Sequence, residues 1–196
     1  MTGRRARKAL WKEIRRIAEA DLALVAEEIR DLEAEAEGDA YYRAVGLHAR
    51  AESQLATAGT LTELRDVARL AAEARHQIAC ARAGEELTPR PLCLFDPAHG
   101  PSAREVVFAR TGGALESVPA CSACAEEVDA GRAPLSRKVM VSGRPQPYYR
   151  SPAHVGYYGS GDETLSDLLV FDLSTAALAD LGLGLFDLAG WPDLGV

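Results

Sequence analysis

The feature that most constrains this chain is a stripe of apolar residues, spaced three and four apart, that begins at Leu10 and extends to Ala36. The members of the stripe are Trp11, Ile14, Ala18, Leu22, Val25, Ile29, Leu32 and Ala36. This spacing places all of them along one face of an α-helix. The sequence therefore predicts a long amphipathic helix that Gly38 ends, with Asp39 as the cap of the next one.

Two further helices are predicted between Asp39 and Gly84. The helix that begins near Asp39, the second of the chain, has a weaker apolar stripe and ends at Gly59. Thr60 and Glu63 then form the pattern of a capping box, in which each side chain accepts a hydrogen bond from the other residue's backbone N–H. The expected buried face of the second helix is Tyr42, Val45, Ala49 and Ala56. That of the third is Leu61, Leu64, Val67, Ala68, Ala71, Ile78 and Ala79.

Helices joined by short turns pack antiparallel, so residues 1–87 are predicted to form a helical hairpin or a three-helix bundle. With 196 residues, of which 47% are hydrophobic, the chain is long enough for this unit and a second one. Within the bundle we expect structural roles for His48 and His76. Cys80 is expected to behave as a small apolar residue.

The other three cysteines fall in a second part of the chain, in the pattern Cys93-x5-His99 followed by Cys121-x2-Cys124. Zinc takes sulfur and nitrogen ligands in a tetrahedron, and two tight loops can supply two ligands each. A Cys-x2-Cys pair at the start of a helix favours thiolates, because unpaired amides and the helix dipole offset their charge. The sequence therefore predicts a structural zinc site. A redox Cys-x2-Cys pair and ordinary half-buried cysteines are the alternatives.

The surrounding residues predict short strands rather than long helices. Residues 105–110 and 114–118 flank Gly112 and Gly113, which predicts a β-hairpin. Residues 91–131 resemble a treble-clef zinc fold. In both, a loop with metal ligands comes first, a β-hairpin follows, and a second pair of ligands stands at the start of a helix. Taken with the helical part, this predicts an α+β protein: an N-terminal antiparallel helical hairpin or three-helix bundle, a small treble-clef-like zinc domain over residues 88–155, and a C-terminal arm.

Residues 92–149 are also similar to a module of uncharacterised actinobacterial proteins, which is often joined to helical segments. The motifs that carry this resemblance are Cys-x-Phe-Asp-Pro-x-His-Gly-Pro, Val-Pro-x-Cys-x-x-Cys, Gly-Arg-x-Pro and Pro-Tyr-Tyr. The resemblance implies that residues 92–149 form one unit. It implies no particular activity.

The net charge of −7 is unevenly distributed along the chain. Residues 1–16 carry +6, residues 17–129 carry −11 and residues 130–161 carry +5, whereas residues 162–196 hold seven acidic residues and no basic ones. The overall charge argues against a protein whose whole surface attracts nucleic acid or anionic lipid. Because the charges of the two ends are opposite in sign, we predict that the basic N-terminus binds the acidic, leucine-rich arm of residues 156–196, within one chain or between protomers.

These observations favour a cytoplasmic protein-interaction or assembly module, with a protein partner or a homo-oligomer, over an enzyme. The sequence holds no Ser/His/Asp pattern, phosphate loop or His-Glu-x-x-His motif, and no apolar stretch of about 20 residues that would span a membrane. A nucleic-acid contact is one alternative, using Arg132, Arg137, Lys138, Arg144, Tyr148, Tyr149 and Arg150. A membrane-surface adaptor is another, using Arg4, Arg5, Arg7, Lys8, Trp11 and Lys12.

Overall fold

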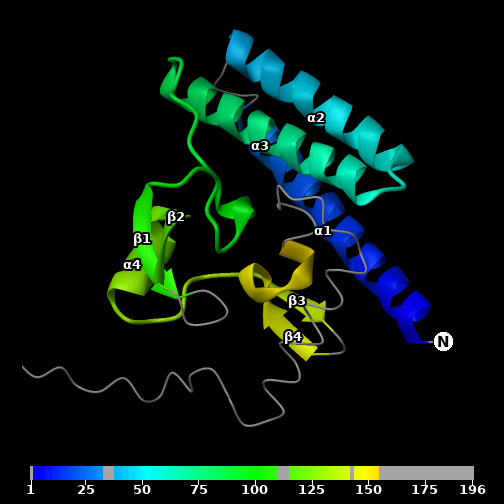
Figure 1. Ribbon diagram of the computed structural model, residues 1–196. Coiled ribbons are helices and arrows are strands. Elements are labelled where there is room, and N and C mark those ends of the chain that lie inside the picture. Colours follow the sequence, from blue (N-terminus) through cyan, green and yellow to red (C-terminus); the bar gives the residue numbers. More distant parts are fainter. Residues whose placement is uncertain (1, 33–37, 110–114, 142–143, 155–196) are drawn as a thin grey trace, which may run out of the picture.

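The computed structural model describes residues 2–32, 38–109, 115–141 and 144–154. Three helices come first, and consecutive helices run in opposite directions, with smaller strands and helices below them (Figure 1). Their bounds are α1 (Thr2–Leu32), α2 (Asp39–Thr57) and α3 (Leu61–Ala83). The α+β class is therefore confirmed, as is the order of helices before small antiparallel strands. The predicted arm of residues 156–196 lies outside the described residues.

The bounds of the helices follow local signals more closely at α3 than at α1. Glu63 N–H donates to the Thr60 hydroxyl over 3.2 Å, and Thr60 N–H donates to Glu63 Oε2 over 2.9 Å, which confirms the capping box. At the other end Gly84 is left-handed, with φ of 70°, as a C-terminal cap requires. The predicted start of the first helix at Leu10 is wrong, because the alanines, arginines and lysines before the apolar stripe are good helix formers and extend α1 to Thr2.

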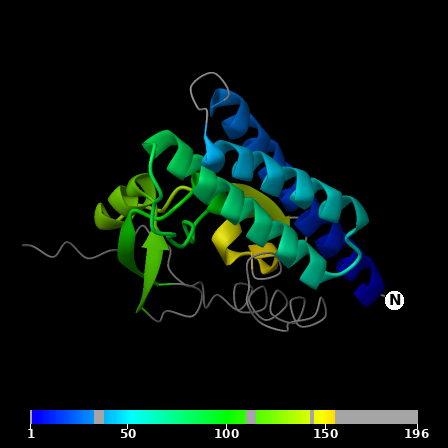
Figure 2. The same cartoon turned by 90° about the horizontal axis from the view of Figure 1, so that it is seen from above.

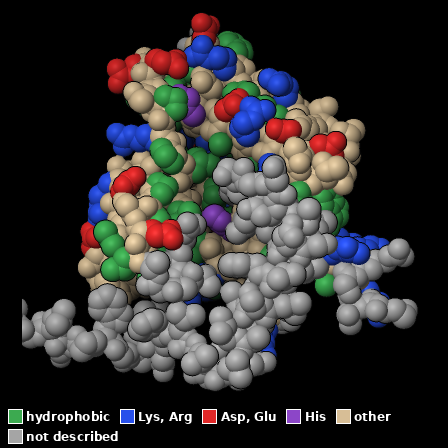
Figure 3. Space-filling model, viewed as in Figure 1, with side chains coloured by type: hydrophobic (Ala, Val, Ile, Leu, Met, Phe, Trp, Pro, Cys, Tyr) green, Lys and Arg blue, Asp and Glu red, His purple; other side chains and the backbone are tan. Residues whose placement is uncertain are grey.

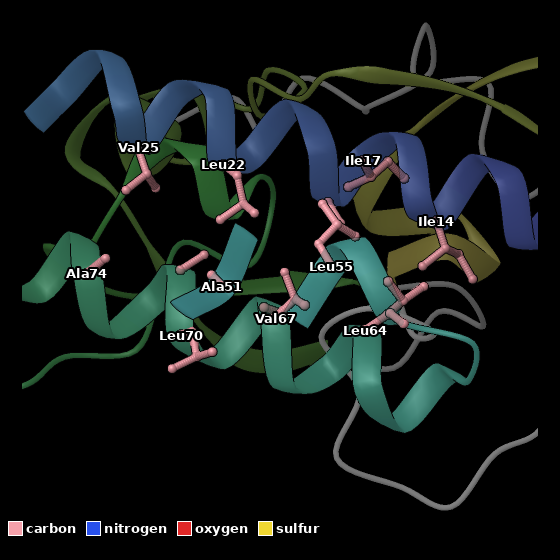
Figure 4. Close-up of a cluster of buried hydrophobic side chains, with 14 of the residues drawn as sticks. Ile14, Ile17, Leu22, Val25, Ala51, Leu55, Leu64, Val67, Leu70 and Ala74 are labelled. Carbon is pink, nitrogen blue, oxygen red and sulfur yellow. The ribbon is translucent and has the colours of Figure 1, made fainter. Parts of the chain in front are cut away.

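The core of the bundle is built from the predicted stripes of α1 and α3, together with a different face of α2 than predicted. Figure 4 shows Ile14 of α1 pointing toward Leu64 of α3, and Val25 of α1 pointing toward Ala74 of α3. The residues of α2 that are buried in this core are Ala44, Ala51 and Leu55.

The predicted buried face of α2 is wrong. Tyr42 is 66% exposed and Val45 is 38% exposed, because the small side chains of Ala44 and Ala51 let α2 approach its neighbours closely. Asp39 is the first residue of α2 rather than its cap. The cap is Gly38, which makes no side-chain hydrogen bond.

The second part of the chain contains the predicted hairpin. Strands β1 (Arg104–Ala109) and β2 (Leu115–Ala120) pair antiparallel, with Val106 opposite Val118, and α4 (Ser122–Asp129) follows β2. The hairpin is therefore confirmed, whereas its predicted turn at residues 111–113 lies outside the described residues. Val106 and Val118 point into a second buried cluster, which also contains Cys93, Phe95, Ala120, Cys124 and Ala125.

A second hairpin connects this unit to the bundle. It consists of β3 (Lys138–Val141) and β4 (Arg144–Pro147), followed by a 3-10 helix, η2 (Tyr148–Arg150). The views of Figures 1 and 2 place this segment against the helical layer. Val139, Tyr148 and Ala153 belong to the same buried cluster as the helices. The two parts of the chain therefore share a packed interface.

The surface of the helical part carries charges of both signs. On the face shown in Figure 3, Lys and Arg side chains are interspersed with Asp and Glu side chains over the helices. Within the described residues, no helix combines the length and the apolar character that a membrane span requires.

Candidate metal centre

The first two candidate ligands lie at the two ends of a tight loop. Cys93 N–H donates to the Gly100 carbonyl over 3.0 Å, and Gly100 has a φ of 80° that favours glycine. Between them Pro97–His99 form a short 3-10 turn, η1, whose N-terminus is capped by the Asp96 side chain through Ala98 N–H over 3.1 Å. The loop therefore folds His99 back toward Cys93.

The other two ligands lie at the start of α4. Cys121 is the N-cap residue of this helix, and its Sγ accepts a hydrogen bond from Cys124 N–H over 3.5 Å. Strand β2 leads directly into this cap. The ligand loop is attached to β2 by a hydrogen bond of 2.9 Å from Leu94 N–H to the Pro119 carbonyl. The hairpin thus brings the two ligand pairs together.

The geometry of the four side chains fits one metal ion. Their coordinating atoms all lie within 4.8 Å of one another. His99 Nδ1 is 3.4 Å from Cys124 Sγ and 3.7 Å from Cys121 Sγ. A tetrahedral zinc, with bonds of about 2.3 Å to sulfur and about 2.0 Å to nitrogen, would separate such atoms by about 3.5 Å. The predicted set of Cys93, His99, Cys121 and Cys124 is therefore brought together as a Cys3His cluster.

The electrostatics of the cluster favour a bound cation. Cys93 and Cys124 are fully buried, Cys121 is half-buried and His99 is exposed. Burial raises the pKa of the Cys93 thiol, and burial together with the nearby Cys93 charge raises the pKa of the Cys124 thiol strongly. The positive charge of a metal ion would offset both costs, because coordinated thiols lose their protons.

An ion pair between Asp96 and Arg137 stabilises the ligand loop. The Arg137 guanidinium donates to both oxygens of Asp96, with Nη2 2.5 Å from Oδ1 and Nε 2.9 Å from Oδ2. Burial opposes ionisation of Asp96, but the hydrogen bond and charge of Arg137 outweigh it and lower the pKa of the carboxyl. Arg137 Nη2 also lies 2.6 Å from Asp21 Oδ1 of α1. One guanidinium therefore holds the loop and the bundle together.

Three aromatic rings pack beside the cluster. Phe95 of the ligand loop contacts Phe108 of β1 and Tyr149 of η2 edge to face, with centroids 4.9 and 5.3 Å apart, and Phe108 and Tyr149 are 5.7 Å apart. Such pairs stabilise a core beyond the area they bury. The ligand loop is therefore packed against strand β1 and against η2.

Two further residues form hydrogen bonds with the backbone of the ligand loop, and neither was predicted from the sequence. Ser136 Oγ donates to the Phe95 carbonyl over 2.9 Å and accepts from Tyr148 N–H over 3.0 Å. His154 Nε2 lies 3.1 Å from the Leu94 carbonyl. Neither residue belongs to a motif with recognisable spacing, since each bonds a backbone group far away in the chain. Only the folded chain identifies them.

The residues predicted for a nucleic-acid contact are not all exposed. Tyr148 is fully buried beneath the Arg137 guanidinium, which lies 5.0 Å from its ring centroid. The bundle covers the Tyr148 ring, so this ring is not available to a nucleic acid, and two carboxylates hold the Arg137 guanidinium. Arg132 pairs with Glu127 over 2.7 Å, and Tyr149 packs in the aromatic group. The exposed members are Arg132, Lys138, Arg144 and Arg150.

The residues predicted for a membrane contact lie in the first turns of α1. Trp11 packs against the core of the bundle and is partly buried, so only part of its ring is exposed for contact with a lipid surface. The side chain of Arg4 lies outside the described residues. The exposed members of the set are Arg5, Arg7, Lys8 and Lys12.

Comparison of the chain with protein-family models, with curated proteins and with solved structures finds no match.

Proposed function

We propose that the chain is a structural-zinc protein, in which Cys93, His99, Cys121 and Cys124 hold one zinc ion, and that it acts in protein interaction or assembly. The observation that carries the zinc proposal is the convergence of four coordinating atoms within 4.8 Å from two loops far apart in the sequence. Three sulfurs and an imidazole are a ligand set that zinc prefers. The resemblance of residues 92–149 to an actinobacterial module is compatible with this proposal.

A structural role follows from the number of ligands. Four protein ligands fill a zinc tetrahedron and leave no position for an activated water, which catalytic zinc sites require. The cluster of buried residues around Cys93 and Cys124 is small, so metal binding supplies much of the folding free energy of this part. We therefore propose a non-enzymatic protein. The predicted cytoplasmic location stays a prediction.

The proposed mode of assembly is a contact between copies of the chain. The exposed cations Arg5, Arg7, Lys8 and Lys12 line the start of α1, and residues 162–196 hold seven acidic residues and no basic ones. Complementary charges of this kind speed association and fix the register of an interface. We propose that the acidic segment of one copy binds the basic start of α1 in another.

Elemental analysis of purified full-length protein tests the zinc proposal. We expect one zinc per chain that survives dialysis, and loss of it in Cys121→Ser. Cys80→Ser is the matched control, because it changes a cysteine outside the cluster and leaves the retained zinc in place. A zinc content well below one per chain that Cys121→Ser does not alter would refute the proposal.

Light scattering over a salt series tests the assembly proposal. We expect a mass above that of one chain at low salt, which falls as salt screens the charges. A chain that lacks residues 162–196 stays monomeric under all conditions. An unchanged mass after this deletion contradicts the proposal. A steep negative dependence of RNA or DNA affinity on salt in filter binding would favour the nucleic-acid alternative instead.

A further inference from the structure

A second cluster of metal-binding side chains lies at the C-terminal end of α3. His76 and Cys80 are four residues apart, which places them one turn apart on the same face of the helix. His76 Nε2 lies 3.6 Å from Cys80 Sγ, between the 3.4 and 3.7 Å that separate His99 Nδ1 from Cys124 Sγ and Cys121 Sγ in the Cys3His cluster. The Glu86 carboxylate completes a group whose coordinating atoms all lie within 4.8 Å of one another.

The end of α3 explains how Glu86 reaches the helix. Gly84 adopts its left-handed conformation directly after α3, and its N–H donates to the Cys80 carbonyl over 2.9 Å. The chain therefore turns back, and Leu87 N–H donates to Cys80 Sγ over 3.4 Å. The turn therefore holds the segment that carries Glu86 against Cys80.

The polar surroundings of the cluster include the C-terminal end of α3 and one ion pair. The last turn of a helix carries partial negative charge, and Cys80 lies in the last turn of α3, with His76 one turn before it. Arg43 of α2 donates to Glu86 Oε2 over 3.2 Å and to Gln77 Oε1 over 2.8 Å. This contact uses Oε2 of the Glu86 carboxylate.

A cavity opens beside the cluster. It has a volume of about 410 Å³ and is lined by the start of α2, including Asp39 and Arg43, and by Cys80 and Glu86. Three protein ligands leave a fourth position of a zinc tetrahedron open, and such sites keep that position for water or another small ligand. The cavity supplies the room for it.

We infer that His76, Cys80 and Glu86 form a second metal site, which binds a divalent transition-metal ion of the zinc class with one exchangeable position facing this cavity. The inference goes beyond the structural zinc at Cys93. It also replaces the separate structural roles predicted from the sequence for His76 and Cys80. With three ligands, one of them 68% exposed, this site binds its ion less tightly than the Cys3His cluster.

Cobalt titration of the full-length protein, carrying its retained zinc, tests the inference. Uptake is followed by the thiolate-to-cobalt charge-transfer absorption and by metal content. We expect one further ion per chain in the wild type, and loss of that ion in Cys80→Ala and in His76→Ala. Glu86→Gln weakens binding about tenfold, which corresponds to about 1.4 kcal/mol.

Glu85→Gln is the matched control, because Glu85 lines the same cavity and carries the same charge but is not part of the cluster. We expect this variant to bind cobalt as the wild type does. Equal weakening by Glu85→Gln and Glu86→Gln overturns the inference, since it shows only general attraction of cations. Absence of a further ion, or wild-type uptake by Cys80→Ala, overturns it as well.

Two measurements keep the result independent of folding and of the first site. Circular dichroism checks each variant, and Glu86→Gln changes a side chain that is 68% exposed. Cys121→Ser removes the retained zinc of the Cys3His cluster but leaves the cobalt uptake at Cys80. Failure of the proposed structural zinc and failure of this second site are therefore distinguishable.

Discussion

Arg137 Nη2 lies 2.6 Å from Oδ1 of Asp21, which joins the segment after α4 to the middle of α1. Asp21 is fully buried, and the Arg137 side chain is only 20% exposed. The same guanidinium holds Asp96 in the ligand loop. Two buried carboxylates from different parts of the fold therefore pair with the same cation.

Arg137→Ala is expected to destabilise the protein severely. It leaves Asp21 and Asp96 buried without their cation, and breaking a buried ion pair in this way costs about 3–5 kcal/mol. Urea unfolding followed by circular dichroism measures the change in the free energy of unfolding. Arg132→Ala serves as control, because its pair with Glu127 is exposed and its loss changes stability little. Equal effects of the two substitutions would contradict the role of Arg137.

Glu13→Gln is expected to reduce the dependence of stability on pH. The Arg16 hydrogen bond lowers the pKa of the Glu13 carboxyl, with further help from Met140 N–H, which donates to it over 3.3 Å. A carboxyl with a lowered pKa in the folded state stabilises above its unfolded pKa of about 4.3, and this contribution is lost as pH falls through the folded value. The substitution therefore lowers stability near neutral pH, by less than about 1 kcal/mol.

The check on this prediction is urea unfolding at a series of pH values. The difference in unfolding free energy between wild type and Glu13→Gln should shrink as pH falls below the unfolded pKa. Arg16→Ala should reduce the pH dependence in the same way, because it removes the partner that lowers the pKa. A difference that grows toward acid would reverse the assigned sign.

His99 substitutions test whether the exposed imidazole is the fourth ligand. His99→Ala should weaken zinc binding by more than the about 10–100-fold that loss of an outer-shell partner typically costs. His99→Cys should restore tight binding, since a fourth thiolate is also a favourable zinc ligand. Competition with a chromophoric chelator measures both affinities. Tight zinc binding by the alanine variant would show that three cysteines suffice.

Thr60→Ala is expected to destabilise α3. It removes the hydroxyl that accepts from Glu63 N–H, and loss of such an N-terminal cap costs about 1 kcal/mol. Thermal unfolding measures the effect. Thr62→Ala is the matched control, because Thr62 is an exposed threonine of the same helix that takes no part in the capping box. A Thr60→Ala protein as stable as the control would mean that the cap contributes nothing measurable.

The sequence by itself determined the features that depend on neighbouring residues. The capping box of Thr60 and Glu63 and the left-handed Gly84 are local devices, so their residues specify them without help from the rest of the fold. The β1–β2 hairpin and the Cys3His set were likewise predictable, because glycines mark the turn and metal-ligand spacing needs only two tight loops.

The tertiary structure alone decided which surfaces face each other. The buried face of α2 is set by how closely Ala44 and Ala51 pack on other helices, and several faces of α2 have acceptable apolar spacing. Arg137 belongs to a basic stretch of sequence, yet two acids brought to it from distant segments make it an internal link. His76 and Cys80 gain a third partner only because the chain turns back at Gly84. Contacts between residues far apart in the chain produce no periodic pattern in the sequence, because they depend on how the elements pack rather than on the spacing of residues along the chain.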